Sequence, residues 1–125
     1  MSKTMNGGHE IAWRDGPRVI FAAVELAVDR CESTEWTLEA PRGTDLASEA
    51  AVRFAMELFK ESFPEQNGLG PFQITMGRLE TQPVDSSVLA VAYVAFHAIC
   101  RAFSINPGAR FSFDEKNGTF SLSCG

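Results

Sequence analysis

The 125-residue chain is 45% hydrophobic and 22% charged, which is ordinary for a globular domain and excludes disorder or low complexity over most of its length. Its net charge of −5 opposes the phosphates of nucleic acids, and it has no lysine and arginine run, so we expect no nucleic-acid partner. The three cysteines show no paired spacing, as in reduced intracellular proteins, and no secretory signal is seen. We therefore expect a cytoplasmic protein.

The N-terminus is polar and contains glycine. We predict that residues 1–8 form a disordered tail and that residues 9–125 form a single domain. His9, at the junction, is expected to belong with the tail. Ile11 and Trp13 alternate with polar neighbours and predict a short edge strand, which would end at the turn Asp15-Gly16-Pro17.

The stretch from Pro17 to Cys31 has two interpretations. Proline is favoured at the first position of a helix, and Glu25 and Asp29 would share its solvent face, so we predict a helix. A long strand from Arg18 onward is the alternative, because valine, isoleucine and phenylalanine favour sheets. The apolar positions with helical spacing are Ile20, Val24, Ala27, Val28 and Cys31.

A second helix is predicted from a cap at Thr44 or Asp45 to about Phe63. Its charges alternate in sign at neighbouring helical positions, which is typical of a solvated face with internal ion pairs. The polar positions are Glu49, Arg53, Glu57, Lys60 and Glu61.

Two further strands are predicted at residues 36–40 and 72–80, where apolar and polar residues alternate. Residues 64–71 between them read as a loop, whose glycines precede a strand and so do not form a phosphate-binding turn. Gly77 indicates a bulge or a close backbone approach. The side chains expected to face inward are Trp36, Leu38, Phe72, Ile74 and Met76.

Residues 88–103 are almost wholly apolar and lack glycine and proline, which predicts a helix buried on most of its circumference. Asp85, with Ser86 and Ser87, would cap its start, and residues 104–108 contain the proline and glycine that end it. The run is shorter than the roughly 20 residues that a bilayer requires, so we expect a core helix and no membrane.

Residues 109–124 predict a β-hairpin, because Asn117-Gly118 is a favoured two-residue turn. Pairing outward from this turn places aromatic and small apolar side chains on one buried face. The expected pairs are Phe113 with Leu122 and Phe111 with Cys124.

This order of elements predicts an α+β domain of two layers. About three helices would pack on one face of a mixed, mainly antiparallel sheet of about four strands, ending in the β-hairpin.

The polar residues Tyr93, His97 and Arg101 lie one helical turn apart and form the one polar ribbon of interest on the 88–103 helix. Beneath a cleft, Arg101 could hold an anion and His97 could exchange a proton. Arg78 or Glu80 from the preceding strand could contribute. The alternative is an exposed helix stripe without a ligand.

Metal binding and nucleophilic catalysis are not predicted. His97 and Cys100, with Cys31 and Cys124, supply enough ligands for zinc, but the spacing lacks a Cys-x-x-Cys pair and the two helical residues diverge around the axis. No cofactor, metal or catalytic residue is therefore assigned.

Two hypotheses of function follow. The first is a non-catalytic interaction or regulatory module that self-associates or binds another protein through a sheet face or edge, since the chain holds ten phenylalanines and two tryptophans. The second is a binding protein for a small anionic ligand, or a small acid/base enzyme, that uses Tyr93, His97, Arg101 and Arg78.

Overall fold

The computed structural model describes residues 4–81 and 88–123. The predicted helix cap at Asp85–Ser87 and the predicted partner Cys124 lie outside these residues. The elements are β1 (Met5–Asp15), β2 (Arg18–Arg30), β3 (Thr37–Glu39), α1 (Leu46–Ser62), α2 (Pro64–Asn67), β4 (Phe72–Thr81), α3 (Val88–Ala102), β5 (Phe111–Asp114) and β6 (Thr119–Leu122).

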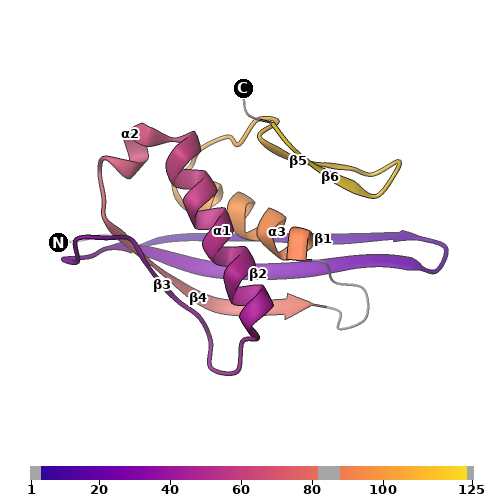
Figure 1. Cartoon of the computed structure of the whole chain (residues 1–125), viewed down its shortest axis with the longest axis horizontal. Helices are drawn as coiled ribbons and strands as arrows, with labels where there is room; N and C mark the ends of the chain where they lie inside the picture. The colour runs from indigo at the N-terminus through magenta and orange to yellow at the C-terminus, as the bar shows by residue number, and fades with distance from the viewer. Residues whose placement is uncertain (1–3, 82–87, 124–125) are drawn as a thin grey trace.

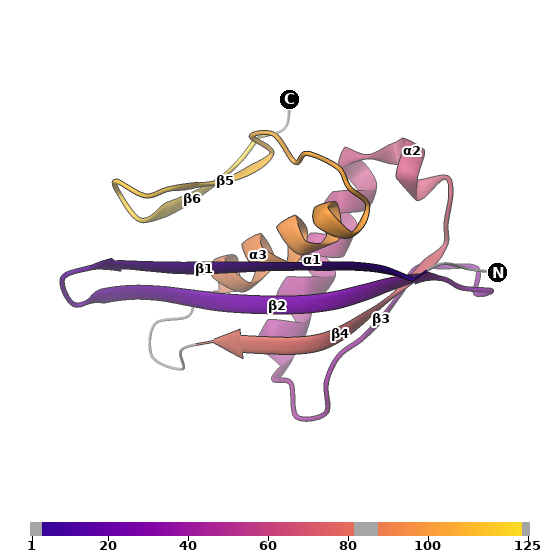
Figure 2. The same ribbon diagram turned by 180° about the vertical axis from the view of Figure 1, so that it is seen from behind.

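The main sheet has four strands in the order β1-β2-β4-β3, in which β3 is parallel to β4 and the other neighbours are antiparallel. Helices α1 and α3 cover one face, and within residues 4–81 and 88–123 no helix lies on the other face (Figure 1 and Figure 2). The predicted α+β class, with helices on one face of a mixed sheet, is confirmed. The final hairpin forms a separate two-stranded sheet that lies next to α3, on the side of β1 away from β2 (Figure 2).

The predicted helix from Pro17 to Cys31 is wrong, because Arg18–Arg30 is strand β2. This strand lies between β1 and β4, so both its edges are paired. Glu25 and Asp29 are four residues apart, which suits a helix face, but an even spacing also places both on one face of a strand. Here they lie on the outer face. The side chains on the helix-covered face are Ile20, Ala22, Val24, Leu26 and Val28.

The predicted disordered tail is also wrong at residues 5–8, since β1 begins at Met5 and His9 lies within it. The strand pairs with β2 from Met5 opposite Val28 to Asp15 opposite Arg18. Gly7 is pressed against the backbone of α3, where a Cβ atom would lie 2.0 Å from the carbonyl oxygen of Ala98. Pairing and helix contact order this polar stretch.

The turn predicted at residues 15–17 is confirmed as a two-residue connection of Gly16 and Pro17. Gly16 has φ 58°, a value that glycine adopts without strain. Glycine at the first central position matches the turn that joins antiparallel strands closely.

Helix α1 begins after Asp45, whose side chain accepts a hydrogen bond from the Ser48 amide, as the sequence predicts for a cap. The ion pairs expected on its solvent face are present, each at 3.4 Å, and join Arg53 to Glu49 and Lys60 to Glu57. Residues 64–67, predicted as loop, form the short helix α2.

Gly77 marks a bulge in β4, as the sequence suggested. Glu25 pairs with Arg78 and Leu26 pairs with Met76, so Gly77 is the extra residue on its strand. The bulge reverses which residues of β4 face the helices: Met76 precedes it on the covered face, and Leu79 follows it there.

Helix α3 is the core element, with most of its side chains fully buried. It packs on β1, β2, α1 and the final hairpin, which explains why it is apolar nearly all round. Its end is closed by Ser104 with φ 57° and by the Ile105 amide, which donates to the Cys100 carbonyl at 2.8 Å.

The final hairpin forms as predicted, but with another register. Its loop has four residues, Glu115 to Gly118, and the Asp114 side chain accepts from the amides of Lys116 and Asn117. A shift of two residues leaves every side chain on the same face, because strands alternate with period two. The observed pairs are Phe111 with Leu122 and Phe113 with Phe120.

Candidate functional site

A cavity of about 350 Å³ lies between β1 and the final hairpin, over α3. Five consecutive β1 residues, from His9 to Trp13, line it with Tyr93 of α3 and with Phe113 and Glu115 of the hairpin. Successive side chains of a strand point to opposite faces, so one face could contribute only every second residue. The cavity therefore meets β1 at its edge, where its backbone is presented.

In the described part of the chain, β1 pairs with β2 and with no other strand. The pair that flanks a two-residue turn is hydrogen-bonded, and such pairs alternate with non-hydrogen-bonded ones. Because Asp15 and Arg18 flank the turn, the residues that direct their N–H and C=O groups to the free edge have even numbers. They are Asn6, Gly8, Glu10, Ala12 and Arg14.

The far end of the cavity is closed by contacts between the two hairpin turns. The indole N–H of Trp13 donates to the Glu115 carbonyl at 2.7 Å. Arg18 donates to the carbonyls of Asn117 and Gly118 at 3.3 and 3.2 Å, and its guanidinium lies 5.1 Å from the Trp13 ring centroid. These contacts hold the hairpin beside β1.

Tyr93 forms the floor of the cavity and is half-buried. Burial raises the pKa of its phenol, and the carboxylate of Glu115 raises it further. The carboxylate of Glu115 is therefore close enough to the Tyr93 hydroxyl for its charge to affect the ionisation of the phenol. The aromatic rings around Tyr93 belong to His9, His97, Phe111, Phe113 and Phe120.

His9 of β1 stacks on His97 of α3, with ring centroids 4.8 Å apart and planes at 21°. Burial, followed by the charges of His97 and Arg101, lowers the pKa of His9 to about 4. His97 lies 2.8 Å through Nε2 from the Phe111 carbonyl, so Nε2 carries the proton, because a carbonyl only accepts. Burial also lowers the pKa of His97. Both rings are neutral at pH 7 and fasten the hairpin and β1 to α3.

The predicted ribbon is therefore divided. Tyr93 lines the cavity, His97 is engaged with Phe111, and Arg101 is exposed at the end of the helix. Arg78 is not near them: it bonds Glu80 at 2.6 Å on the outer face of β4.

Arg78 and Glu80 line another cavity, of about 420 Å³, with Thr44, Asp45 and Ser48 at the start of α1.

The sequence did not indicate His9, Trp13 and Glu115, which line the cavity between β1 and the hairpin. The alternation around Trp13 beside a turn was the signal for a strand pair, but nothing local indicated that the final hairpin would lie against it.

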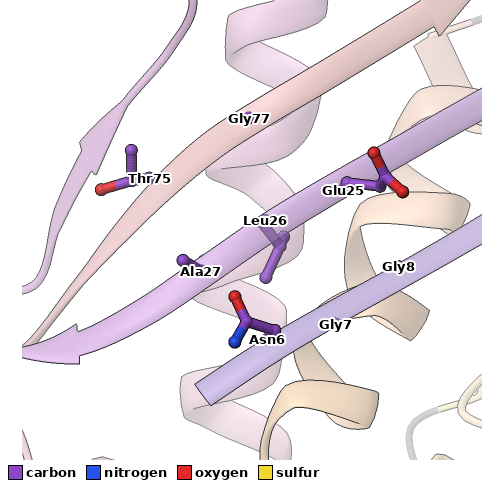
Figure 3. Close-up of a pocket in the computed structure, with 8 residues that line it drawn as sticks. All are labelled: Asn6, Gly7, Gly8, Glu25, Leu26, Ala27, Thr75 and Gly77. Atoms are coloured by element: carbon purple, nitrogen blue, oxygen red, sulfur yellow. The ribbon is translucent and has the colours of Figure 1, made fainter. Parts of the chain in front are cut away.

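A broader cavity, of about 520 Å³, lies on the uncovered face of the sheet. Figure 3 shows the side chains of Asn6, Glu25 and Thr75 reaching it from β1, β2 and β4. Gly8 and Gly77 also border it, and their lack of side chains leaves the backbone bare. The two cavities border consecutive parts of β1, with Asn6–Gly8 at the cavity on the uncovered face and His9–Trp13 at the cavity beside the hairpin.

Among residues 4–81 and 88–123, no three histidine, cysteine or acidic side chains gather as metal ligands. Cys100 is fully buried, and burial raises the pKa of its thiol to about 12, although the charge of Arg110 acts in the opposite direction. Cys31 is partly exposed on another part of the fold. No helix in the described ranges is long and apolar enough to span a bilayer.

No protein-family model and no curated protein matches the chain. Among solved structures, it is similar to a protein from Thermus thermophilus, with a TM-score of 0.58 and 20% identity over 77% of this chain and 15% of that one. It also aligns with Streptococcus pneumoniae phosphomevalonate kinase, with a TM-score of 0.42 and 9% identity over 88% of this chain and 37% of that one. The first similarity shows the fold alone. The matched region is a small part of the much longer Thermus thermophilus protein.

Proposed function

We propose that the chain is a protein-interaction module that binds an extended segment of a partner protein along the free edge of β1. The observation that carries the proposal is the edge itself, which is open to a cavity over the five consecutive residues from His9 to Trp13. An added strand would gain main-chain hydrogen bonds from the edge and specificity from alternate side chains.

The Met5–His9 part of the edge lacks the sequence features that usually protect an edge strand against pairing. Natural sheets guard long edges with lysine, proline or inward-pointing charge. From Met5 to His9, the β1 strand contains none of these. Further along, Glu10 and Arg14 point to the outer face, and Asp15 is the last residue before the turn. Gly7 holds this stretch against α3, so a partner would meet a fixed template.

A single extended segment fits this edge better than a second copy of the chain. The β5–β6 hairpin lies along β1 on the side away from β2 (Figure 1). Two copies that paired β1 edges about an axis perpendicular to the sheet would bring both hairpins to one seam. A partner segment brings only one strand.

The geometry gives less support to catalysis. The Nε2 atom of His97 is occupied by the Phe111 carbonyl, and Arg101 and Arg78 lie away from the cavity that Tyr93 lines. The proposed acid/base ribbon thus lacks a shared concave site in the described residues.

The test is titration of ¹⁵N-labelled protein with a blocked seven-residue peptide of alternating threonine and valine, TVTVTVT. We expect shifts at the amides of Gly8, Glu10 and Ala12, and slower hydrogen exchange there. Ala12→Pro should abolish binding because it removes an edge N–H without breaking the β1–β2 ladder. Ala12→Val, which keeps that N–H, is the matched control.

Two results would contradict the proposal. One is a set of β1 amides that do not respond at millimolar peptide. The other is equal binding by the proline and valine variants. Sedimentation of the chain alone tests whether a second copy of the chain pairs with the edge instead. A dimer that becomes monomeric in the Ala12→Pro variant would mean that a second copy uses the edge.

A further inference from the structure

The second inference rests on the proposed function and concerns which side chain the partner inserts. In a strand added beside β1, alternate side chains must point to the helix-covered face, as do His9, Ile11 and Trp13 of β1 itself. On that face the added side chains enter the cavity above Tyr93. The chemistry of the cavity therefore selects every second residue of the partner.

The cavity combines aromatic walls with negative charge. Its rings are those of Trp13, Tyr93 and Phe113, and its charged side chain is the carboxylate of Glu115, since Glu10 lines the cavity with its backbone and points its side chain to the outer face. The Glu115 carboxylate is exposed and has no ion pair within the described ranges. Aromatic faces beside carboxylates attract organic cations, because the ring quadrupole and the charge act in the same direction.

The fold already accommodates a cation next to this cavity. Arg18 of β2 stacks its guanidinium against Trp13 and donates to two carbonyls of the hairpin loop. Arg18 serves the closed end of the cavity and does not line it. At the other end of the cavity, the charge of Arg101 lowers the pKa of His9, and Arg101 does not line the cavity either. Neither guanidinium forms an ion pair with Glu115 within the described ranges.

We infer that the partner strand places an arginine or lysine side chain in this cavity, with its stem along Tyr93 and Phe113 and its charged group at Glu115. Charge complementarity also suits the acidic chain, whose net charge is −5. A neutral side chain of the same shape would leave the carboxylate unpaired, and an acidic one would be repelled.

The experiment compares two blocked peptides, TVTRTVT and its analogue with citrulline in place of arginine, by NMR titration at low salt. Citrulline keeps the length and shape of arginine but has no charge. We expect the arginine peptide to bind about tenfold more tightly, which is the ratio that a cation next to aromatic rings and a carboxylate provides. The ratio should fall as salt is added.

Matched variants locate the effect. Glu115→Gln should reduce the ratio to about two- to threefold, whereas Glu65→Gln, an equal loss of charge on exposed α2, should leave it unchanged. Equal binding of the two peptides to β1 would refute the cation preference and leave the edge proposal standing. No response of β1 to either peptide or to TVTVTVT would refute both.

Discussion

The contact between Gly7 and α3 can be tested by adding one methyl group. In Gly7→Ala, the new Cβ would lie 2.0 Å from the Ala98 carbonyl oxygen and 2.7 Å from the Ala102 nitrogen. These two atoms are the partners that helix geometry joins in one backbone hydrogen bond. The methyl group would press on that bond, and neither atom can rotate away.

The magnitude follows from the size of the overlap. Ordinary contact begins near 3.4 Å, so α3 or β1 must move by more than 1 Å. Overpacking of this kind costs about 1–3 kcal/mol, and a clash with backbone belongs at the upper end. The lower entropy of unfolded alanine returns about 0.4–1 kcal/mol. We expect a net loss of about 2–3 kcal/mol, or roughly 6–15 °C in Tm for a domain of this length.

The matched control is the neighbouring glycine. In Gly8→Ala, the nearest atoms lie at 3.4 Å, one of them on the flexible Glu25 side chain, so we expect a stability within about 0.5 kcal/mol of the parent. Urea unfolding followed by circular dichroism, with comparison of m values, measures both. If the two variants were equally stable, the close approach of α3 to β1 would be refuted.

Three further results are expected. First, because folding lowers the pKa of His9 to about 4 and also lowers that of His97, the unfolded state takes up protons first, and stability should decline as the pH falls from about 6.5 towards 4. The loss should be about 1–2 kcal/mol after allowance for partial exposure, and His9→Phe should reduce it in acid-unfolding curves. Second, Asp45→Ala should cost about 1 kcal/mol in urea unfolding while Asp45→Asn, which keeps a capping oxygen, costs less. Third, iodoacetamide followed by peptide mapping should modify Cys31 well before Cys100, whose thiol is fully buried; equal rates would contradict that burial.

The sequence predicted those elements whose signals are local. The cap at Asp45, the bulge at Gly77 and the burial of α3 depend on neighbouring residues, and all are found. Strand β2 was only the alternative interpretation of its stretch, because its outer face carries Val19, Phe21 and other apolar residues and the period-two alternation is hidden.

The candidate site was predictable only in part. Tyr93 was singled out from its helical position, and it does line a cavity. The residues opposite it come from β1 and from the final hairpin. The spacing of residues within a helix cannot predict contacts with residues so far away in the chain. His9 is an example. A polar residue after two glycines is typical of a disordered tail, and only the strand pairing with β2 shows that it belongs to the fold.

The clasp between the two hairpin turns bears on the order in which the molecule assembles. Trp13 and Arg18 meet carbonyl groups 99 to 102 residues further along the chain. The β1–β2 hairpin can pair from its own two-residue turn as soon as it leaves the ribosome, whereas its contacts with the final hairpin can form only after β5 and β6 are synthesised. Such distant closures slow folding, since chain entropy is lost before contacts compensate for it. In a growing polypeptide, the open edge of β1 therefore exists before the hairpin that lies beside it, and the cavity between them forms only after both are in place.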